Sequence, residues 1–169
     1  MNKEKTLILN SLQVNQKITR MAHEIYENHH KSKELVLIGI SGNGNVLANR
    51  IAALLKEISK LNIQKFELTL NKEKPLTAAI EFTGDVSDLK GKEVIVIDDV
   101  LNSGKTLMYA CRFILEVDVK RLSIATFVDR FHRKFPLKAD YSGLVLSTNL
   151  KEHVSVDLSN NKESVHLEA

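Results

Sequence analysis

The chain has 169 residues, of which 43% are hydrophobic and 27% are charged, the balance of an ordinary globular domain with a sizeable core. The net charge of +3 is too small to indicate a nucleic-acid partner by itself, and the single cysteine, Cys111, excludes an intrachain disulfide and a cysteine-based metal cluster. No apolar run approaches the roughly 20 residues of a membrane span. Residues 1–6 are charged, whereas a signal peptide has a long apolar run. We therefore expect a single cytoplasmic domain over residues 1–169 without a membrane partner.

Hydrophobic periodicity divides the first half of the chain into helix and strand patterns. Val14, Ile18 and Met21 belong to a stripe with helical spacing, whereas the run from Leu35 to Ile40 is continuously apolar, which is typical of a buried strand. In chain order, we expect a short strand or extended arm over 6–10, a helix over 11–28, a buried strand over 35–40, a loop over 41–45, a helix over 46–59 and a half-buried strand over 66–70.

The second half continues this alternation after an irregular segment. Residues 71–85 contain Pro75 and Gly84 without a clear period, which is typical of a mobile loop. We then expect a strand over 94–98, a helix over 106–117, a strand over 121–128 and one or two strands after residue 140. Because strands alternate with helices, the pattern predicts an α/β fold with a central parallel sheet flanked by helices.

The segment from Val94 to Thr106 carries the most chemical information. Four β-branched apolar residues suit a central parallel strand, and Asp98 and Asp99 follow at its carboxyl end, where open α/β sheets bind ligands. Residues 102–106 form a turn into a helix, which offers backbone N–H groups, hydroxyls and a helix dipole to a phosphate. Carboxylates beside such a turn suit a ligand that carries both hydroxyls and a phosphate, that is, a sugar phosphate.

Two common phosphate-binding motifs do not match this chain. The run Gly104-Lys105-Thr106 resembles the end of a P-loop, but the first glycine of that motif would fall on Asp99. In the dinucleotide-binding motif, Gly42 and Gly44 would require a third glycine where Leu47 stands. The alternative to a ligand site is an ordinary turn capped by a serine, which would not need two adjacent carboxylates at the end of a buried strand.

This segment resembles the ribose-5-phosphate motif of the type I phosphoribosyltransferases, in which a hydrophobic strand, two acids and a short loop precede Thr/Ser-Gly-x-Thr. In that family the acids bind the 2′ and 3′ hydroxyls of phosphoribosyl pyrophosphate (PRPP), and the loop holds its 5′-phosphate. The resemblance implies a small hood over the sheet, Mg²⁺ as the cofactor that accompanies PRPP, an oligomer, and catalytic roles for Asp98 and Asp99. It implies PRPP binding by Asp98, Asp99, Val100, Leu101, Asn102, Ser103, Gly104, Lys105 and Thr106.

The loop after the first buried strand is the expected pyrophosphate loop of this family. It consists of Ser41, Gly42, Asn43 and Gly44, whose backbone amides can bind an anion. The family typically has a basic residue here, and its absence weakens the electrostatic attraction for pyrophosphate. The alternative is a plain turn rich in residues that tolerate left-handed backbone.

A second resemblance points to one group within the class. Residues 18–25 and 127–141 look like segments of the bifunctional pyrimidine-operon attenuator and uracil phosphoribosyltransferase family. In that family the second segment lies over the base, which implies base-binding roles for Val128, Asp129, Arg130, Phe131, His132 and Arg133. Phe131 replaces a glycine of the family, so its ring is expected to stack on the base or to crowd the pocket. The alternative for this segment is a solvated basic loop.

The expected hood segment, residues 70–82, also departs from that family. It is shorter, and it carries only Lys72 and Lys74 where the family has arginine. Phosphoribosyl transfer passes through an oxocarbenium-like sugar and requires neutralisation of the leaving pyrophosphate and exclusion of water. A short hood and a neutral pyrophosphate loop both predict transfer activity that is low.

Basic residues of the second segment favour a further partner. Cations interleave with Phe131 and Phe135, a combination typical of single-stranded RNA binders, although such charge runs are usually solvated. The family resemblance adds one face of the first helix. The expected RNA contacts are Thr19, Arg20, His23, Lys134 and Lys138.

The sequence thus predicts a PRPP-dependent enzyme that transfers ribose 5-phosphate to a pyrimidine base, with uracil as the expected base and UMP and pyrophosphate as products. Two alternatives stay open. One is a nucleotide-sensing protein that binds an mRNA leader and attenuates transcription with little catalysis. The other is a purine phosphoribosyltransferase, because Phe131 can reshape the base site.

Overall fold

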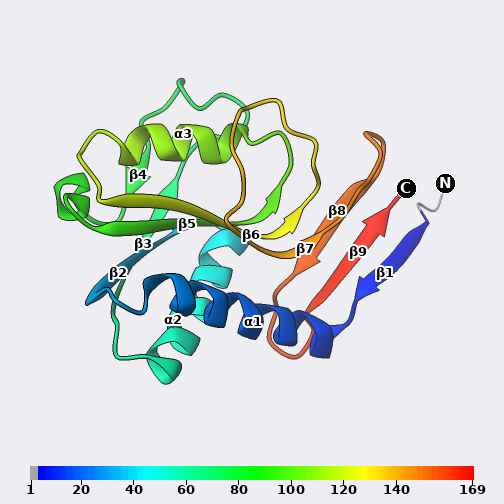
Figure 1. The fold of residues 1–169 in the computed structure, drawn as a ribbon. Coiled ribbons are helices and arrows are strands. Elements are labelled where there is room, and N and C mark those ends of the chain that lie inside the picture. Colours follow the sequence, from blue (N-terminus) through cyan, green and yellow to red (C-terminus); the bar gives the residue numbers. More distant parts are fainter. Residues whose placement is uncertain (1–3) are drawn as a thin grey trace.

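The computed structural model describes residues 4–169, which form two β-sheets and three α-helices (Figure 1). The larger sheet has six strands in the order β4-β3-β2-β5-β6-β7, and the smaller has three in the order β1-β9-β8. Within these described residues, no helix is long and apolar enough to span a membrane. The strands are β1 (Lys5–Leu9), β2 (Glu34–Ile40), β3 (Asn62–Thr69), β4 (Glu81–Phe82), β5 (Glu93–Leu101), β6 (Arg121–Asp129), β7 (Tyr141–Val145), β8 (His153–Asp157) and β9 (Ser164–Glu168).

The predicted central parallel sheet is confirmed. Strands β2, β5 and β6 lie side by side in parallel, with Val36 beside Val94 and Val94 beside Leu122. Their continuous apolar runs are explained by burial on both faces of the sheet. The two-residue strand β4 pairs antiparallel with β3 at the edge.

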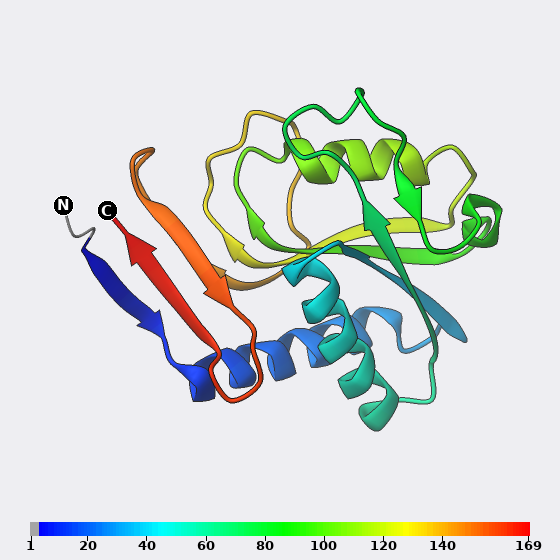
Figure 2. The ribbon, with the colours of Figure 1, turned by 180° about the vertical axis from the view of Figure 1, so that it is seen from behind.

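Helices cover both faces of this sheet. The helices α1 (Ser11–His29) and α2 (Asn43–Ile58) pack on one face, and α3 (Lys105–Ile114) packs on the other (Figures 1 and 2). Because side chains of a strand alternate between faces, Ile95 and Ile97 of β5 join the core under α1 and α2, whereas Val94 and Val96 join the core under α3.

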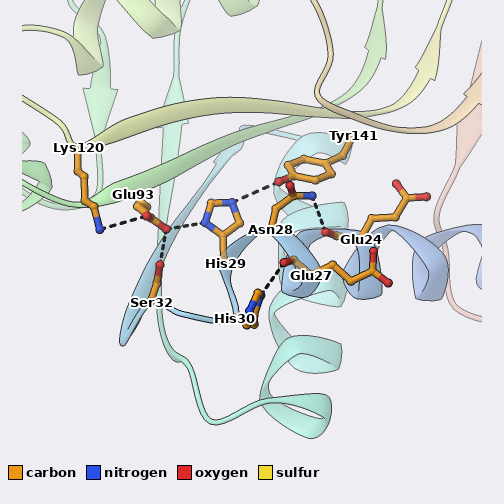
Figure 3. Close-up of polar contacts among 9 residues, drawn as sticks. All are labelled: Glu24, Glu27, Asn28, His29, His30, Ser32, Glu93, Lys120 and Tyr141. Atoms are coloured by element: carbon orange, nitrogen blue, oxygen red, sulfur yellow. Dashed lines mark hydrogen bonds and ion pairs between the residues drawn. The ribbon is translucent and has the colours of Figure 1, made fainter.

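The long helix α1 is defined at both ends by side chains. Asn10 and Gln13 form a reciprocal capping box at its start. At its end, the buried His29 lies 2.6 Å from Glu93 and 3.3 Å from the hydroxyl of Tyr141 (Figure 3). Ser32 and Lys120 also contact Glu93, so this cluster ties the helix to the amino-terminal ends of β5 and β6.

The smaller sheet, which we call the hood sheet, joins the two ends of the described chain. Strand β9 pairs antiparallel with β1 on one side and with β8 on the other, and its Val165 is fully buried. The expectation that residues 70–82 would form the hood was therefore wrong in location. That segment follows β3 and includes β4, while strands from the two ends of the described chain make the small second layer (Figure 1).

Several predicted boundaries also shift. Helix α2 begins at Asn43 rather than at residue 46. The chain turns at Gly42, which has a φ of 93°, and the residues that follow it are already helical. Strand β5 continues to Leu101, which places Asp98 and Asp99 inside the strand. The segment 71–85, expected to be irregular, includes β4, and a 3₁₀ helix follows over Val86–Leu89.

Candidate functional site

A cavity of about 490 Å³ opens at the carboxyl end of β5, between the six-stranded sheet and the hood sheet. The predicted phosphate loop forms its floor, while strand β8 forms the opposite wall. The lining residues are Asn43, Lys72, Asp98, Asp99, Val100, Leu101, Asn102, Ser103, Gly104, Lys105, Thr106, Leu107, His153, Val154, Ser155 and Val156. All nine residues predicted to bind PRPP are thus brought together in one cavity.

The phosphate loop has the geometry of an anion-binding turn. Gly104 has φ of 85°, a left-handed conformation, and helix α3 begins immediately after it. Of the first amides of the helix, that of Lys105 donates to the hydroxyl of Ser103 at 3.3 Å. The helix dipole and these amides therefore face the cavity. The carbonyl of Ser103 accepts hydrogen bonds from the amides of Lys134 and Phe135, which support the loop from behind.

The two aspartates differ in their environment. Asp98 is 4% exposed, and burial raises its pKa to about 7, with a further contribution from the charge of Asp99 and opposition from Lys72. Asp99 is partly exposed and faces the cavity. Gly44 allows the start of α2 to pack against them, since a Cβ there would lie 2.7 Å from the carbonyl oxygen of Ile97 and 3.0 Å from Cα of Asp98.

The expected pyrophosphate loop contributes one residue to the cavity lining, Asn43. Its Nδ2 donates to Oδ2 of Asp99 at 3.1 Å and to the carbonyl oxygen of Val156 in β8 at 2.9 Å. Ser41 and Gly42 complete the turn, and the amide of Ser41 donates to the carbonyl of Leu68.

Two lysines supply positive charge at the cavity. Lys72, from the segment between β3 and β4, is one of the lining residues. Lys105 donates from Nζ to the carbonyl oxygen of Glu73 at 2.6 Å, which ties that segment to the phosphate loop. The expected hood segment thus lies at the cavity, although it does not form the hood sheet.

The segment predicted to bind the base lies behind the phosphate loop, and none of its residues is among those that line the cavity. Val128 is buried, and the carboxylate of Asp129 pairs with Arg133. His132 lies 2.6 Å from the carbonyl oxygen of Thr148. Arg130 is 8% exposed and forms hydrogen bonds to the phosphate loop and to residues 148–152.

Phe131 has a backbone conformation that non-glycine residues rarely adopt. Its φ is 60°, in the left-handed region that favours glycine. Its ring is 61% exposed and lies under the guanidinium of Arg133, whose Cζ is 5.1 Å from the ring centroid. In this structure the side chain therefore neither crowds the cavity nor lines it.

The residues suggested to contact RNA fall into two groups. Thr19, Arg20 and His23 are exposed on α1, and Arg20 also bonds to Glu24 and to carbonyls of β7. Lys134 and Lys138 are exposed in the loop near α3, on the opposite face of the sheet. The two groups therefore belong to elements that pack on opposite faces of the sheet.

Sequence reasoning missed the role of strand β8 in the cavity. The alternation of Val154, Val156 and Leu158 predicted a late strand, but nothing in the sequence indicated that it would pair with β9 and face the phosphate loop. Long-range pairing of this kind leaves only a local strand pattern in the sequence.

Comparison with known proteins agrees with this geometry. The family model for the phosphoribosyl transferase domain matches residues 6–160. The chain is 35% identical to the bifunctional protein PyrR of Oceanobacillus iheyensis, over 93% of this chain and 92% of that protein. It is 36% identical to the pyrimidine operon regulatory protein of Lactococcus lactis subsp. lactis, over 90% of this chain and 89% of that protein.

Solved structures share the fold at lower sequence identity. The hypoxanthine phosphoribosyltransferase of Trypanosoma cruzi has a TM-score of 0.77 at 15% identity and covers 96% of both chains. A hypoxanthine-guanine phosphoribosyltransferase of Bacillus anthracis has a TM-score of 0.70 at 22% identity, over 87% of this chain and 85% of that chain. The chain is therefore a phosphoribosyltransferase that belongs to the family of the bifunctional PyrR proteins.

Proposed function

We propose that this phosphoribosyltransferase transfers ribose 5-phosphate from PRPP to uracil, giving UMP and pyrophosphate. The observation that carries the proposal is the single cavity that contains both the Asp98–Asp99 pair and the whole loop from Asn102 to Thr106. The pyrimidine operon in the name of the relative from Lactococcus lactis supports a pyrimidine rather than a purine as acceptor. We propose further that residues 1–169 act as one domain in this reaction.

In this proposal the side chains act mainly by orientation and electrostatics. Asp98 and Asp99 receive the ribose hydroxyls, and the negative charge of Asp99, together with that of Asp98 in its ionised form, stabilises the positive charge that develops at the anomeric carbon. The amides at the start of α3 and the hydroxyls of Ser103 and Thr106 hold the 5′-phosphate. Lys72 and the turn at Ser41–Gly44 receive the leaving pyrophosphate.

A magnesium ion would enter with PRPP. Residues 4–169 contain no cluster of three or more His, Cys, Asp or Glu side chains suited to a metal. The oxygen ligands of Asp98 and Asp99 at the cavity nevertheless fit a hard cation that keeps most of its ligands from water and substrate phosphates. Such an ion would neutralise negative charge on the pyrophosphate group.

The base is expected to lie between the phosphate loop and strand β8. The loop formed by residues 128–133 would frame this space from behind, through its contacts with the phosphate loop and with residues 148–152. This segment would contact the base through its backbone groups, or through its side chains after the loop of residues 128–133 has moved.

Steady-state formation of UMP from uracil, PRPP and Mg²⁺ tests the proposal. Asp98→Asn and Asp99→Asn should each lower kcat/KM by about a hundredfold, since each removes charge next to the reacting carbon. Asp118→Asn is the matched control, because Asp118 is exposed and outside the cavity. Equal activity of all four proteins would overturn the assignment of the site.

The acceptor is tested separately by ligand-dependent melting. A ligand that binds only the folded protein raises the melting temperature with its concentration. UMP and PRPP should stabilise the protein, whereas GMP and IMP should not. A response to GMP or IMP without one to UMP would favour the purine alternative.

A second candidate function is attenuation of transcription through binding of an mRNA leader. It is favoured by the regulatory name of the relative from Lactococcus lactis and by the exposure of Thr19 and His23 on α1. Binding to a pyrimidine-leader hairpin should weaken steeply with salt and should weaken further in Thr19→Ala/His23→Ala. Absence of binding at low salt would remove this candidate.

A further inference from the structure

Strand β8 forms one wall of the cavity but belongs to the hood sheet, not to the sheet that carries the phosphate loop. Its position over the site depends on the packing of Val154 in the core and on the side chains that join the two sheets near the cavity. The side chain of Arg130 makes such a connection at the segment that leads into β8, where His132 also contacts Thr148, and Asn43 makes one at Val156 within the strand.

Arg130 connects the phosphate loop with residues 148–152. Its Nη1 donates to Oδ1 of Asn102 at 2.8 Å, and its Nε donates to the hydroxyl of Thr148 at 3.0 Å. Its Nη2 donates to the carbonyl oxygens of Asn149 at 3.3 Å and Glu152 at 2.6 Å. A guanidinium has five N–H groups, so these four bonds leave little capacity for a substrate.

Asn43 makes the second connection. Its amide nitrogen has two hydrogens, and the structure gives both an acceptor, one on Asp99 and one on the carbonyl of Val156. The same amide therefore orients a carboxylate of the site and holds the middle of β8. A neutral side chain at this place does not add charge for pyrophosphate, but it does span the two sheets.

We propose that Arg130 and Asn43 are positioning residues that together hold β8 over the ribose-phosphate site. This proposal rests on the proposed function of the cavity, and it replaces direct base binding as the role of Arg130. Loss of either side chain should leave the phosphate loop intact and let β8 and residues 148–152 move away from it, so that PRPP binds more weakly.

Hydrogen exchange of the free protein tests the structural part without any activity. In Arg130→Ala, backbone amides of residues 147–158 should exchange about tenfold or more faster, since local opening governs their exchange. Asn43→Ala should show a smaller increase centred on β8. Lys151→Ala and Asn49→Ala are the controls, because Lys151 lies exposed in the same segment and Asn49 lies exposed on the same helix as Asn43. Unchanged exchange in both test variants would overturn the proposal.

Kinetics separate positioning from direct substrate contact. Both variants should raise KM for PRPP by about tenfold to a hundredfold while kcat changes much less, because an ångström-scale displacement of a binding wall is sufficient for such a loss. A rise confined to KM for the base would instead assign Arg130 to base binding and overturn the proposal. If the wild type transfers nothing to uracil, the proposed function fails, and hydrogen exchange still decides the positioning role.

Rescue experiments give a readout that general loss of stability would not produce. Millimolar guanidinium should restore KM in Arg130→Ala by refilling the space between Asn102 and Glu152, whereas ammonium should not. Arg130→Lys keeps the charge but cannot make four bonds, so it should behave like Arg130→Ala. Asn43→Asp keeps the size but loses both donated hydrogen bonds, so it should raise KM at least as much as Asn43→Ala. Rescue of Arg130→Ala by ammonium, or wild-type KM in Arg130→Lys, would overturn the proposal.

Discussion

The imidazole of His29 and the carboxylate of Glu93 lie 2.6 Å apart at the end of the sheet opposite the cavity (Figure 3). His29 ends helix α1 and Glu93 begins strand β5, so this contact joins two elements that are 64 residues apart in the chain. Burial opposes ionisation of Glu93, but hydrogen bonds from His29, Ser32 and Lys120 outweigh it and lower its pKa to about 2.

Glu93→Gln is expected to lower the free energy of unfolding by roughly 1–3 kcal/mol at pH 7, because it removes charge-assisted hydrogen bonds in a partly buried cluster. The lowered pKa makes this contribution complete above the ordinary value of 4.5 and progressively lost as pH falls from 4.5 toward 2. Urea unfolding at several pH values measures it. Glu116→Gln is the control, because Glu116 is exposed and its only described hydrogen bond is made by its backbone amide. A difference between Glu93→Gln and the wild type that does not change with pH would contradict the explanation.

Asp98→Asn should raise stability while it lowers activity. Since the pKa of Asp98 is raised from 3.8 to about 7, the folded state binds the proton more tightly, and wild-type stability declines as pH rises through that range. At pH 8 the asparagine variant should be more stable by on the order of 2 kcal/mol, with the difference gone near pH 4. Thermal unfolding across this range checks the sign, and a variant less stable than the wild type at pH 8 would contradict it.

Phe131 should tolerate glycine but not valine. The left-handed backbone at this position costs roughly 1–2 kcal/mol for residues other than glycine, and Phe131→Gly removes that cost. This gain in stability offsets two losses, namely the contact with Arg133 and the greater conformational freedom of glycine in the unfolded chain. Phe131→Gly should therefore remain within about 1 kcal/mol of the wild type, and Phe131→Val should be lower by about 1 kcal/mol or more. Chemical denaturation measures both, and equal stability of the two variants would show that the backbone relaxes.

Gly44→Ala should disturb the site through backbone packing. The added Cβ would lie 2.7 Å from the carbonyl oxygen of Ile97, so the start of α2 must move away from β5. We expect a loss of roughly 1–3 kcal/mol in stability together with reduced transfer. Gly91→Ala is an informative comparison, because its Cβ would meet nothing within 4 Å and only its positive φ is unfavourable. It should lose stability without loss of specific activity.

The sequence by itself determined the elements whose chemistry is local. The apolar run before Asp98, the adjacent carboxylates and the turn at Ser103–Thr106 predicted a strand, a ligand site and an anion-binding helix start, and the structure has the strand and turn in those places. Such features depend on side-chain periodicity and turn geometry within a few residues, so one stretch of sequence is enough to specify them.

The tertiary structure decided what lies opposite that loop. Pairing of β1 with β9 joins residues that are far apart in the sequence. Strand β8 pairs with the other side of β9 and thereby lies at the cavity. It also decided that Arg130 and Asn43, expected from the sequence to contact substrate, are bonded to the protein itself. Register between distant strands and the partners of a buried side chain depend on the packing of the whole chain, which local patterns do not encode.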